Sequence, residues 1–124
     1  MQRNMPKYQK IKKIGEGSYG EVYLANLSQN IQGRVEQVAI KQFKFSNFEE
    51  GFPATALREI SILKSLDHPN IIQLREILTE DEGKSVSIVM DYMDLDLAKF
   101  LDLQRDPLSD SKVKTLMYQI LSGL

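Results

Sequence analysis

Short segments of alternating apolar and polar residues dominate the chain up to residue 92. Two of them lie within residues 8–25 and flank a glycine-rich turn. Three more follow, namely VAIKQF at 38–43, IIQLREIL at 71–78 and SVSIVMDY at 85–92. Short β-prone runs of this kind, bounded by turn residues, are typical of strands, so the pattern predicts five strands. The polar stretches at 26–37 and 79–84 predict turns between strands.

Between the third and fourth strands, the apolar spacing changes to three and four residues, which is typical of a helix. The apolar positions of this helical face are Ala56, Ile60, Ile62, Leu63 and Leu66. Pro53 suits the first turn of the helix, where a missing N–H is tolerated. We expect the helix to end within 67–70, because the proline there disfavours helical geometry in the residue before it.

Two more helices are predicted after the last strand. The segment LAKFLD at 97–102 follows Asp94 and Asp96, and either carboxylate can cap it. The other helix, within 109–124, has one broad apolar face at helical spacing. This face contains Val113, Leu116, Met117, Ile120, Leu121 and Leu124. Five strands around one helix, followed by further helices, predict an α+β fold.

Composition narrows the class of protein. The 124 residues suffice for one small domain, and 42% hydrophobic with 27% charged residues argues against disorder. A net charge of −1 gives no basic field for nucleic acid, and no apolar run approaches the roughly 20 residues that span a bilayer. The chain has no cysteine, which excludes disulfides and thiolate metal sites and fits a nuclear or cytoplasmic location. We therefore expect neither nucleic acid nor a membrane as partner, and no metal site among these residues.

The turn GEGSYGEV has glycines at Gly15, Gly17 and Gly20, with Val22 two residues on. Glycine lets the backbone approach a phosphate closely and take a positive φ without strain. The motif G-x-G-x-x-G also occurs in dinucleotide-binding oxidoreductases, where a helix follows the glycines. Here the strand pattern EVYLA follows, so the motif predicts a flap over a nucleoside triphosphate. A glycine-rich hairpin without a ligand is the alternative.

A lysine and a glutamate complete this candidate site. Lys41 ends VAIK on the strand after the flap, and Glu59 lies 18 residues later on the predicted helix. The Glu59 carboxylate projects from the edge of the apolar face, where a partly buried charge needs a partner. We predict that Glu59 faces Lys41 and holds its ammonium group for α- and β-phosphate oxygens. The alternative is an ordinary ion pair of doubtful value to stability.

Together, G-x-G-x-x-G-x-V, V-A-I-K and a helix glutamate resemble the amino-terminal lobe of protein kinases. The sequence PATALRE at 53–59 is similar to the signature helix of the cyclin-dependent kinases, best known as PSTAIRE, with departures at Ala54 and Leu57. The resemblance runs from about residue 8 to residue 124. It implies a small lobe at 1–93, built from a five-stranded antiparallel sheet and one helix, and the first helices of an incomplete large lobe at 94–124.

The resemblance implies a serine/threonine protein kinase that uses ATP and Mg²⁺. Lys41 and Glu59 would be the catalytic ion pair that assembles the active site. The nucleotide-binding residues would be Ile14, Gly15, Glu16, Gly17, Ser18, Tyr19, Gly20, Val22, Ala39, Lys41, Met90, Asp91, Met93 and Asp96. Among these, Asp91 and Met93 would meet the adenine through backbone groups, and Asp96 would meet the ribose.

The resemblance also implies regulation and partners. Ser18 and Tyr19 match the positions of inhibitory phosphorylation, where a phosphate would repel the phosphates of ATP. Pro53 and Leu57 would face a cyclin-like regulatory subunit, and protein substrates would accept the phosphoryl group. Arg58 matches the arginine that, in relatives, clasps a phosphorylated activation loop.

The chain contains no H-R-D and no D-F-G motif: its one histidine, His68, is followed by Pro69 and Asn70. A protein kinase needs the aspartates of these motifs for catalysis and for magnesium. The given residues end within the helix that precedes the catalytic loop in the family. We therefore expect these 124 residues alone to be inactive. The alternative to a kinase portion is an inactive fragment that acts as a cyclin- or nucleotide-binding module.

Overall fold

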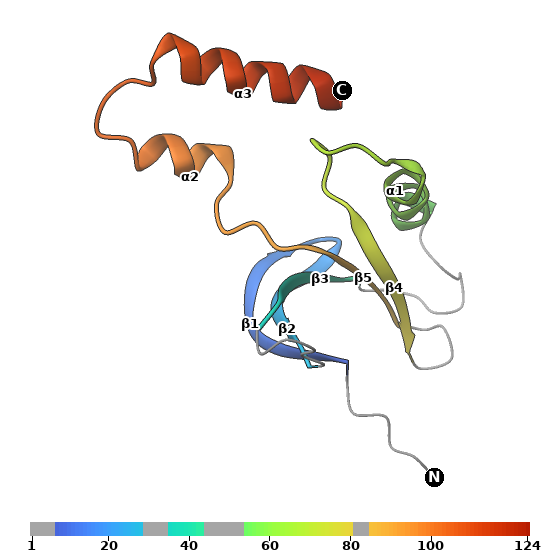
Figure 1. Cartoon of the computed structure of the whole chain (residues 1–124). Coiled ribbons are helices and arrows are strands. Elements are labelled where there is room, and N and C mark those ends of the chain that lie inside the picture. The colour runs from blue at the N-terminus through green and yellow to red at the C-terminus, as the bar shows by residue number, and fades with distance from the viewer. Residues whose placement is uncertain (1–6, 29–34, 44–53, 81–84) are drawn as a thin grey trace.

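The computed structural model describes residues 7–28, 35–43, 54–80 and 85–124, which form a curled sheet, a helix packed on it and two further helices (Figure 1). The strands are β1 (Tyr8–Gly17), β2 (Gly20–Leu27), β3 (Gln37–Phe43), β4 (Leu74–Glu80) and β5 (Ser85–Asp91). The helices are α1 (Ala54–Ser65), α2 (Leu97–Asp102) and α3 (Asp110–Gly123). The predicted α+β fold is confirmed, whereas the expectation for Pro53 lies outside the described residues.

The five strands form one antiparallel sheet with the order β1-β2-β3-β5-β4. Consecutive strands pair through hairpins, except that β3 pairs with β5, because α1 and β4 lie between them in sequence. β3 is thus the central strand, and both of its neighbours hold it in register. Lys41 belongs to this strand.

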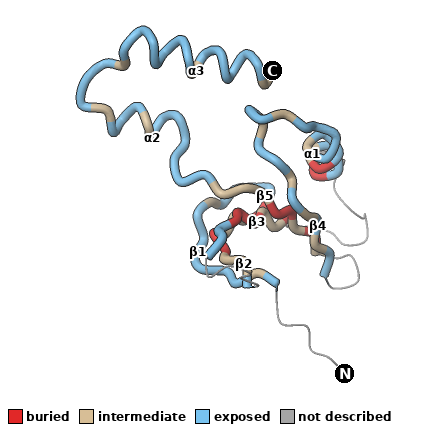
Figure 2. The backbone as a smooth tube through the Cα atoms, viewed as in Figure 1, coloured by how far each residue is buried: buried red, intermediate tan, exposed pale blue. Residues whose placement is uncertain are grey.

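The buried residues lie in the middle strands of the sheet and on one side of α1 (Figure 2). One cluster joins the sheet to α1 and contains Phe43, Ala56, Ile60, Val86 and Ile88. A second cluster contains Ala25, Val38, Ile40 and Val89. Successive strand residues point to opposite faces, so Val38 and Ile40 lie on the face away from α1. The middle strands of the sheet are therefore packed on both faces.

The buried apolar face of α1 is narrower than the sequence predicts. Ala56 and Ile60 are buried and Leu63 packs beside them, but Ile62 and Leu66 are exposed. Their assignment to the buried face was wrong, because position 62 lies roughly 200° around the helix from position 60. The helix ends at Ser65, just before the predicted stop.

β4 begins three residues later than predicted, at Leu74 rather than at residue 71. A turn occupies the intervening segment: the N–H of Asn70 donates to Nδ1 of His68 at 3.0 Å, and the N–H of Ile71 donates to the His68 carbonyl at 3.1 Å. These local hydrogen bonds replace the pairing that a strand would have made. Short polar side chains near a proline commonly favour such turns.

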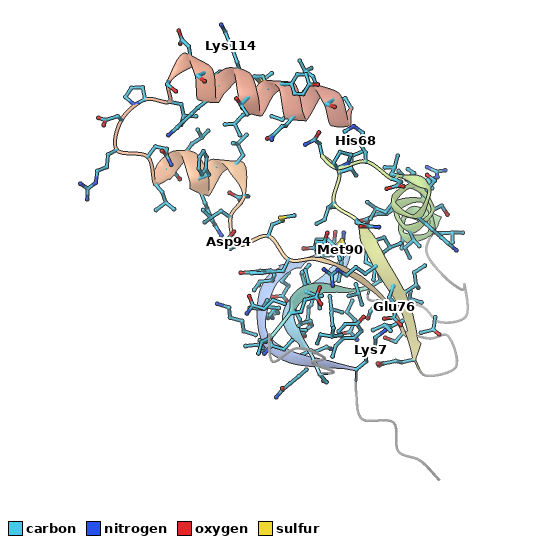
Figure 3. The ribbon with its side chains drawn as sticks, in the orientation of Figure 1. Lys7, His68, Glu76, Met90, Asp94 and Lys114 are labelled. Carbon is cyan, nitrogen blue, oxygen red and sulfur yellow. The ribbon has the colours of Figure 1, made fainter. Side chains whose placement is uncertain are left out.

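The edges of the sheet approach each other at its outer face. β1 and β4 are at opposite ends of the strand order, yet the Tyr8 hydroxyl donates to Glu76 Oε2 at 2.5 Å and Lys7 Nζ lies 3.0 Å from the same oxygen (Figure 3). Burial and the bond to Glu76 raise the pKa of Tyr8 to about 12. The hydrogen bonds from Tyr8 and Lys7 hold the pKa of Glu76 below its usual range. The sheet is therefore strongly curled.

α2 and α3 lie apart from the sheet (Figure 1). Asp96 caps α2, accepting from the Lys99 N–H at 2.8 Å, and Ser109 caps α3, accepting from the Lys112 N–H at 3.3 Å. Neither helix has a buried residue, so the predicted apolar face of α3 is largely exposed. Among the described residues, no helix has the length and apolarity to cross a bilayer.

The end of α3 meets the turn before β4. Ser122 Oγ lies 3.3 Å from His68 Nε2, near the labelled His68 in Figure 3. A Cβ placed on Gly123 would lie 3.1 Å from the carbonyl oxygen of Asn70, closer than most side chains come to a backbone oxygen. The small residue at 123 lets the helix approach this turn closely.

Candidate functional site

The candidate site centres on an ion pair between β3 and α1. Lys41 Nζ lies 2.6 Å from Glu59 Oε1, and 16% of the lysine side chain is exposed against 40% of the glutamate. Packing explains the contact: Ile60 is buried against the sheet, so its neighbour Glu59 stands at the edge of the interface facing β3. The structure thus brings together the two residues predicted to form the catalytic pair, while their action on a nucleotide stays a prediction.

The glycine-rich turn forms the hairpin between β1 and β2. Gly17 pairs with Gly20, and Gly15 pairs with Val22. Gly20 has a φ of 140°, a conformation that residues with a Cβ rarely adopt. Because a strand and not a helix follows the glycines, the turn lacks the strand–turn–helix context of a dinucleotide-binding fold.

Tyr19 folds from this turn over the lysine. Its ring centroid lies 4.5 Å from Lys41 Nζ, and the Phe43 ring centroid lies 5.4 Å from the same atom. A Cβ placed on Gly17 would come within 2.5 Å of the Tyr19 ring, so this position accepts only glycine while the ring is there. The ammonium group of Lys41 therefore lies close to one carboxylate and two aromatic rings, groups that attract a cation.

Strand pairing aligns several predicted nucleotide-binding residues in rows across the sheet. Val22 pairs with Lys41, and Gly15 pairs with Val22, so these three lie side by side. In the next row Ala39 pairs with Met90. Ala39 is buried, and Met90 packs against the cluster under α1 (Figure 3). A small residue at 39 leaves room beside the lysine for a flat group.

Other predicted site residues are less enclosed. Ile14 is exposed and lies at a register irregularity in β1, and Met93 is exposed beyond the end of β5. Asp96 is the cap of α2, so its carboxylate is already engaged with a backbone N–H. Glu16 and Ser18 are exposed at the tip of the hairpin, where Lys13 pairs with Glu16 at 3.1 Å. That these residues bind a nucleotide together stays a prediction.

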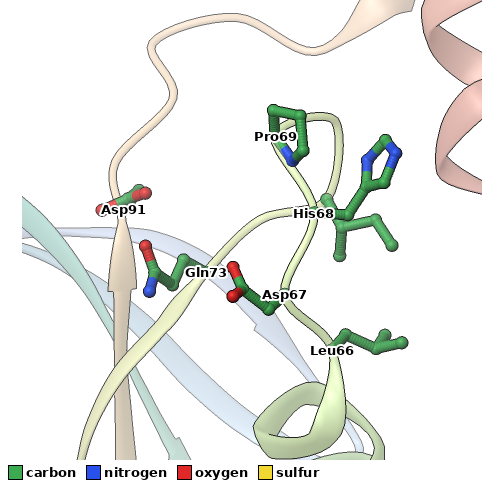
Figure 4. A pocket seen from close by; sticks show the side chains of 7 residues that line it. Leu66, Asp67, His68, Pro69, Gln73 and Asp91 are labelled. Carbon is green, nitrogen blue, oxygen red and sulfur yellow. The ribbon is translucent and has the colours of Figure 1, made fainter.

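A hollow of about 290 Å³ lies behind the end of β5, between this strand and the turn before β4 (Figure 4). Its lining includes Asp67, His68, Gln73 and Asp91. Asp91 is also a predicted nucleotide-binding residue, but neither Lys41 nor the glycine hairpin lines this hollow.

The sequence prediction missed the part played by Arg75. Its guanidinium binds Asp91, a predicted adenine-contacting residue, through Nε at 2.6 Å, and also Glu36 through Nη1. The segment LREILTE at 74–80 does not alternate regularly, so its pattern did not single out Arg75. A bulge is defined by the pairing of two strands, which this segment alone does not specify.

Residues 8–124 match the model of the protein kinase domain. The chain belongs to the protein kinase domain family. It is 38% identical over 122 residues to cyclin-dependent kinase 10 of Mus musculus, and 39% identical over 122 residues to cyclin-dependent kinase G-2 of Oryza sativa subsp. indica. The resemblance to this group of kinases is confirmed.

Both matches cover 98% of this chain, but 33% of the mouse protein and 17% of the rice protein. The chain therefore spans a third or less of the length of these relatives.

Proposed function

We propose that this chain is the ATP-binding portion of a serine/threonine protein kinase of the cyclin-dependent type. In the longer protein it would serve transfer of the γ-phosphoryl group of ATP to a protein hydroxyl. The observation that carries the proposal is the 2.6 Å contact between Lys41 and Glu59 beside the glycine hairpin. The family and the relatives named above support it.

The residues of the site fit a nucleoside triphosphate. Gly15, Gly17 and Gly20 present a backbone without side chains, as a phosphate-binding flap requires. Lys41 supplies the cation, and Ala39 leaves space on the same face of β3 for the base. The backbone of Asp91 and Met93 would contact the adenine. ATP, when bound, supplies the phosphoryl group that is transferred.

Glu59 positions the positive charge of Lys41. Glu59 accepts a hydrogen bond from Lys41 and so fixes the ammonium group at the edge of α1. Partial burial of Lys41 lowers the local dielectric, which strengthens its attraction to phosphate oxygens compared with water. Since α1 carries Glu59, any movement of α1 would also move this contact, which makes the helix a natural point of control.

Magnesium does not fit the described residues. No group of three or more histidine, aspartate or glutamate side chains in this part of the structure could hold a metal ion. We propose that the ligands of Mg²⁺ belong to other parts of the longer protein. We also propose a boundary between the lobes at 93/94, since β5 ends at Asp91 and the chain then leaves the sheet.

A cyclin-like subunit is the proposed regulatory partner. Leu57 is 56% exposed on α1, and a large apolar side chain on an outer helix surface suits a protein contact. Ser18 and Tyr19, both exposed on the hairpin, are the proposed sites of inhibitory phosphorylation. A phosphate on Tyr19 would carry a charge of about −1.5 to −2 beside Lys41 and would compete with ATP for that cation.

A second candidate is a nucleotide- or cyclin-binding module without activity of its own. The absence of H-R-D and D-F-G from these 124 residues favours it for the chain taken alone. The two candidates differ in whether phosphoryl transfer accompanies binding.

The test uses the full-length protein with its cyclin and the variant Lys41→Met, which keeps side-chain length but removes the charge. We expect phosphoryl transfer to be abolished while the unfolding midpoint stays close to that of the unchanged protein. Lys10→Met, on β1, is the matched control and should keep full activity. Normal kinase activity in Lys41→Met would refute the proposed role.

A further inference from the structure

β4 contains a bulge where it passes the end of β5. Leu74 pairs with Met90 and Glu76 pairs with Val89, so two steps along β4 match one step along β5. Arg75 is the extra residue. A bulge commonly re-aims a side chain next to a functional site. Because of this bulge, the side chain of Arg75 does not follow the regular alternation of side chains between the two faces of the sheet. Arg75 lies directly beside the last residues of β5.

The redirected guanidinium joins three segments. Arg75 Nε donates to Asp91 Oδ1 at 2.6 Å, and Nη1 donates to Glu36. Hydrogen bonds to Asp91 and then to Glu36 raise the pKa of Arg75 above its usual value. Two bonds through one planar group restrict position more strongly than a single contact does. β4, the end of β5 and the start of β3 are thereby held together.

Arg75 contacts Asp91 and Glu36 on the face of the sheet opposite to the candidate site. Asp91 pairs with Val38, which belongs to the apolar cluster away from α1. The preceding residue, Met90, packs on the other face with the cluster under α1. Side chains alternate along a strand, so the Asp91 side chain points away from the face that carries Lys41. Arg75 therefore holds the segment without standing in the nucleotide's space.

We propose that Arg75 is a positioning residue for the base of the nucleotide. By fixing the Asp91 side chain, it fixes the backbone that starts at Asp91 and runs to Met93, where adenine would be bound. The inference rests on the proposed function, because it assigns a role within that same site. Its physical reason is preorganisation: a backbone already held in the binding geometry loses less freedom when the ligand binds.

The experiment measures binding of the base and binding of the phosphates separately. Dissociation constants for ATP, adenosine and inorganic tripolyphosphate are measured by calorimetry on the full-length protein and on Arg75→Met. We expect binding of ATP and adenosine to weaken about three- to tenfold, as suits loss of a partly exposed charged network. Binding of tripolyphosphate, which depends on Lys41 and the hairpin, should stay within about twofold.

Two further variants sharpen the result. Arg75→Lys keeps the charge without the planar fork and should recover only part of the adenosine affinity. Lys7→Met is the matched control, because Lys7 also forms an ion pair with β4, to Glu76 at 3.0 Å, but does not touch the end of β5. It should leave all three dissociation constants unchanged.

The outcomes are distinguishable. If the unchanged protein binds neither ATP nor adenosine, the proposed function fails. If it binds both and Arg75→Met binds them equally well, the function stands and the role of Arg75 is refuted. Equal weakening of adenosine and tripolyphosphate would also refute it, because a general loss of structure has no preference for the base. If Arg75→Met does not fold, Arg75→Lys decides by the same comparison.

Discussion

The aromatic ring of Tyr19 lies over the ammonium group of Lys41, with 4.5 Å between the ring centroid and Nζ. The two residues come from different parts of the site, the tip of the hairpin and the central strand. Their contact means that the flap is held down on the lysine by its own side chain. Tyr19 is 38% exposed, so the ring also remains accessible from outside.

This contact predicts that Tyr19→Ala will bind ATP more tightly. A cation–π contact at a partly exposed site is worth about 0.5–1 kcal/mol, and ATP phosphates must replace it to reach Lys41. Removing the ring should therefore raise ATP affinity about two- to fivefold in a calorimetric titration. Tyr118→Ala, at a tyrosine of α3 that is 75% exposed, is the control and should have no effect. Weaker ATP binding by Tyr19→Ala would show that the ring assists the nucleotide instead.

The outer surface of α1 predicts the effect of a charge at Leu57. A buried aspartate at a protein interface is costly, so Leu57→Asp should weaken cyclin binding about tenfold or more. Val35→Asp is a matched control, since Val35 is an exposed apolar residue, at 64%, just before β3 and away from α1. Equal cyclin affinity of the two variants in calorimetry would count against a cyclin-facing helix.

The contact between Tyr8 and Glu76 predicts a pH dependence of stability. Hydrogen bonds from Tyr8 and Lys7 lower the pKa of Glu76 from 4.5. The stabilisation is therefore complete above pH 4.5 and is lost as the pH falls through the lower value of the folded state. Glu76→Gln should reduce the free energy of unfolding at pH 7 by about 1 kcal/mol.

Urea denaturation at a series of pH values between 7 and 3 measures this effect, and the difference between Glu76→Gln and the unchanged protein should shrink below pH 4.5. Glu80→Gln, exposed on the same strand, serves as the control with a change within about 0.5 kcal/mol. A difference that is independent of pH would mean that the carboxylate charge contributes nothing to the contact.

The exposed face of α3 predicts the behaviour of the 124-residue chain alone. Met117, Ile120 and Leu121 are 47%, 45% and 62% exposed, and such a patch binds other apolar surfaces. We expect this chain to bind a hydrophobic dye or to self-associate, and to show no phosphoryl transfer with Mg-ATP. Leu121→Glu should reduce dye binding, whereas Gln119→Glu on the same helix should not. A monomeric, dye-free chain with kinase activity would overturn this expectation.

Local sequence patterns determined the elements of this protein. Short β-prone runs bounded by turn residues predicted the five strands. The residue types before 97–102 predicted a cap at Asp94 or Asp96, and in the structure Asp96 is the cap. The need for glycine in the hairpin could also be predicted, because a positive φ such as that of Gly20 is a local property of the backbone. Such features depend on short-range sterics and hydrogen bonds, which the sequence specifies directly.

The ion pair of the candidate site could be predicted for a different reason. The pairing of Lys41 with Glu59 was predicted from their spacing, a burial argument and the family resemblance, and not from any local rule. Its distance of 2.6 Å depends on how closely α1 packs on β3. Tyr19 was predicted as part of the flap, but its position over Lys41 was not, since a side chain at a turn has several rotamers of similar energy.

Tertiary structure alone decided the remaining features. Ile62 and Leu66 have the composition of a buried face but lie on the exposed side, because α1 contacts the sheet along one narrow line. The bond from Tyr8 to Glu76 and the bonds from Arg75 to Asp91 and Glu36 join residues far apart in the chain. Curling of the sheet and the bulge in β4 bring these groups together, and both arise from pairing between strands. Pairing is a property of two segments at once, so no single segment of the sequence contains it.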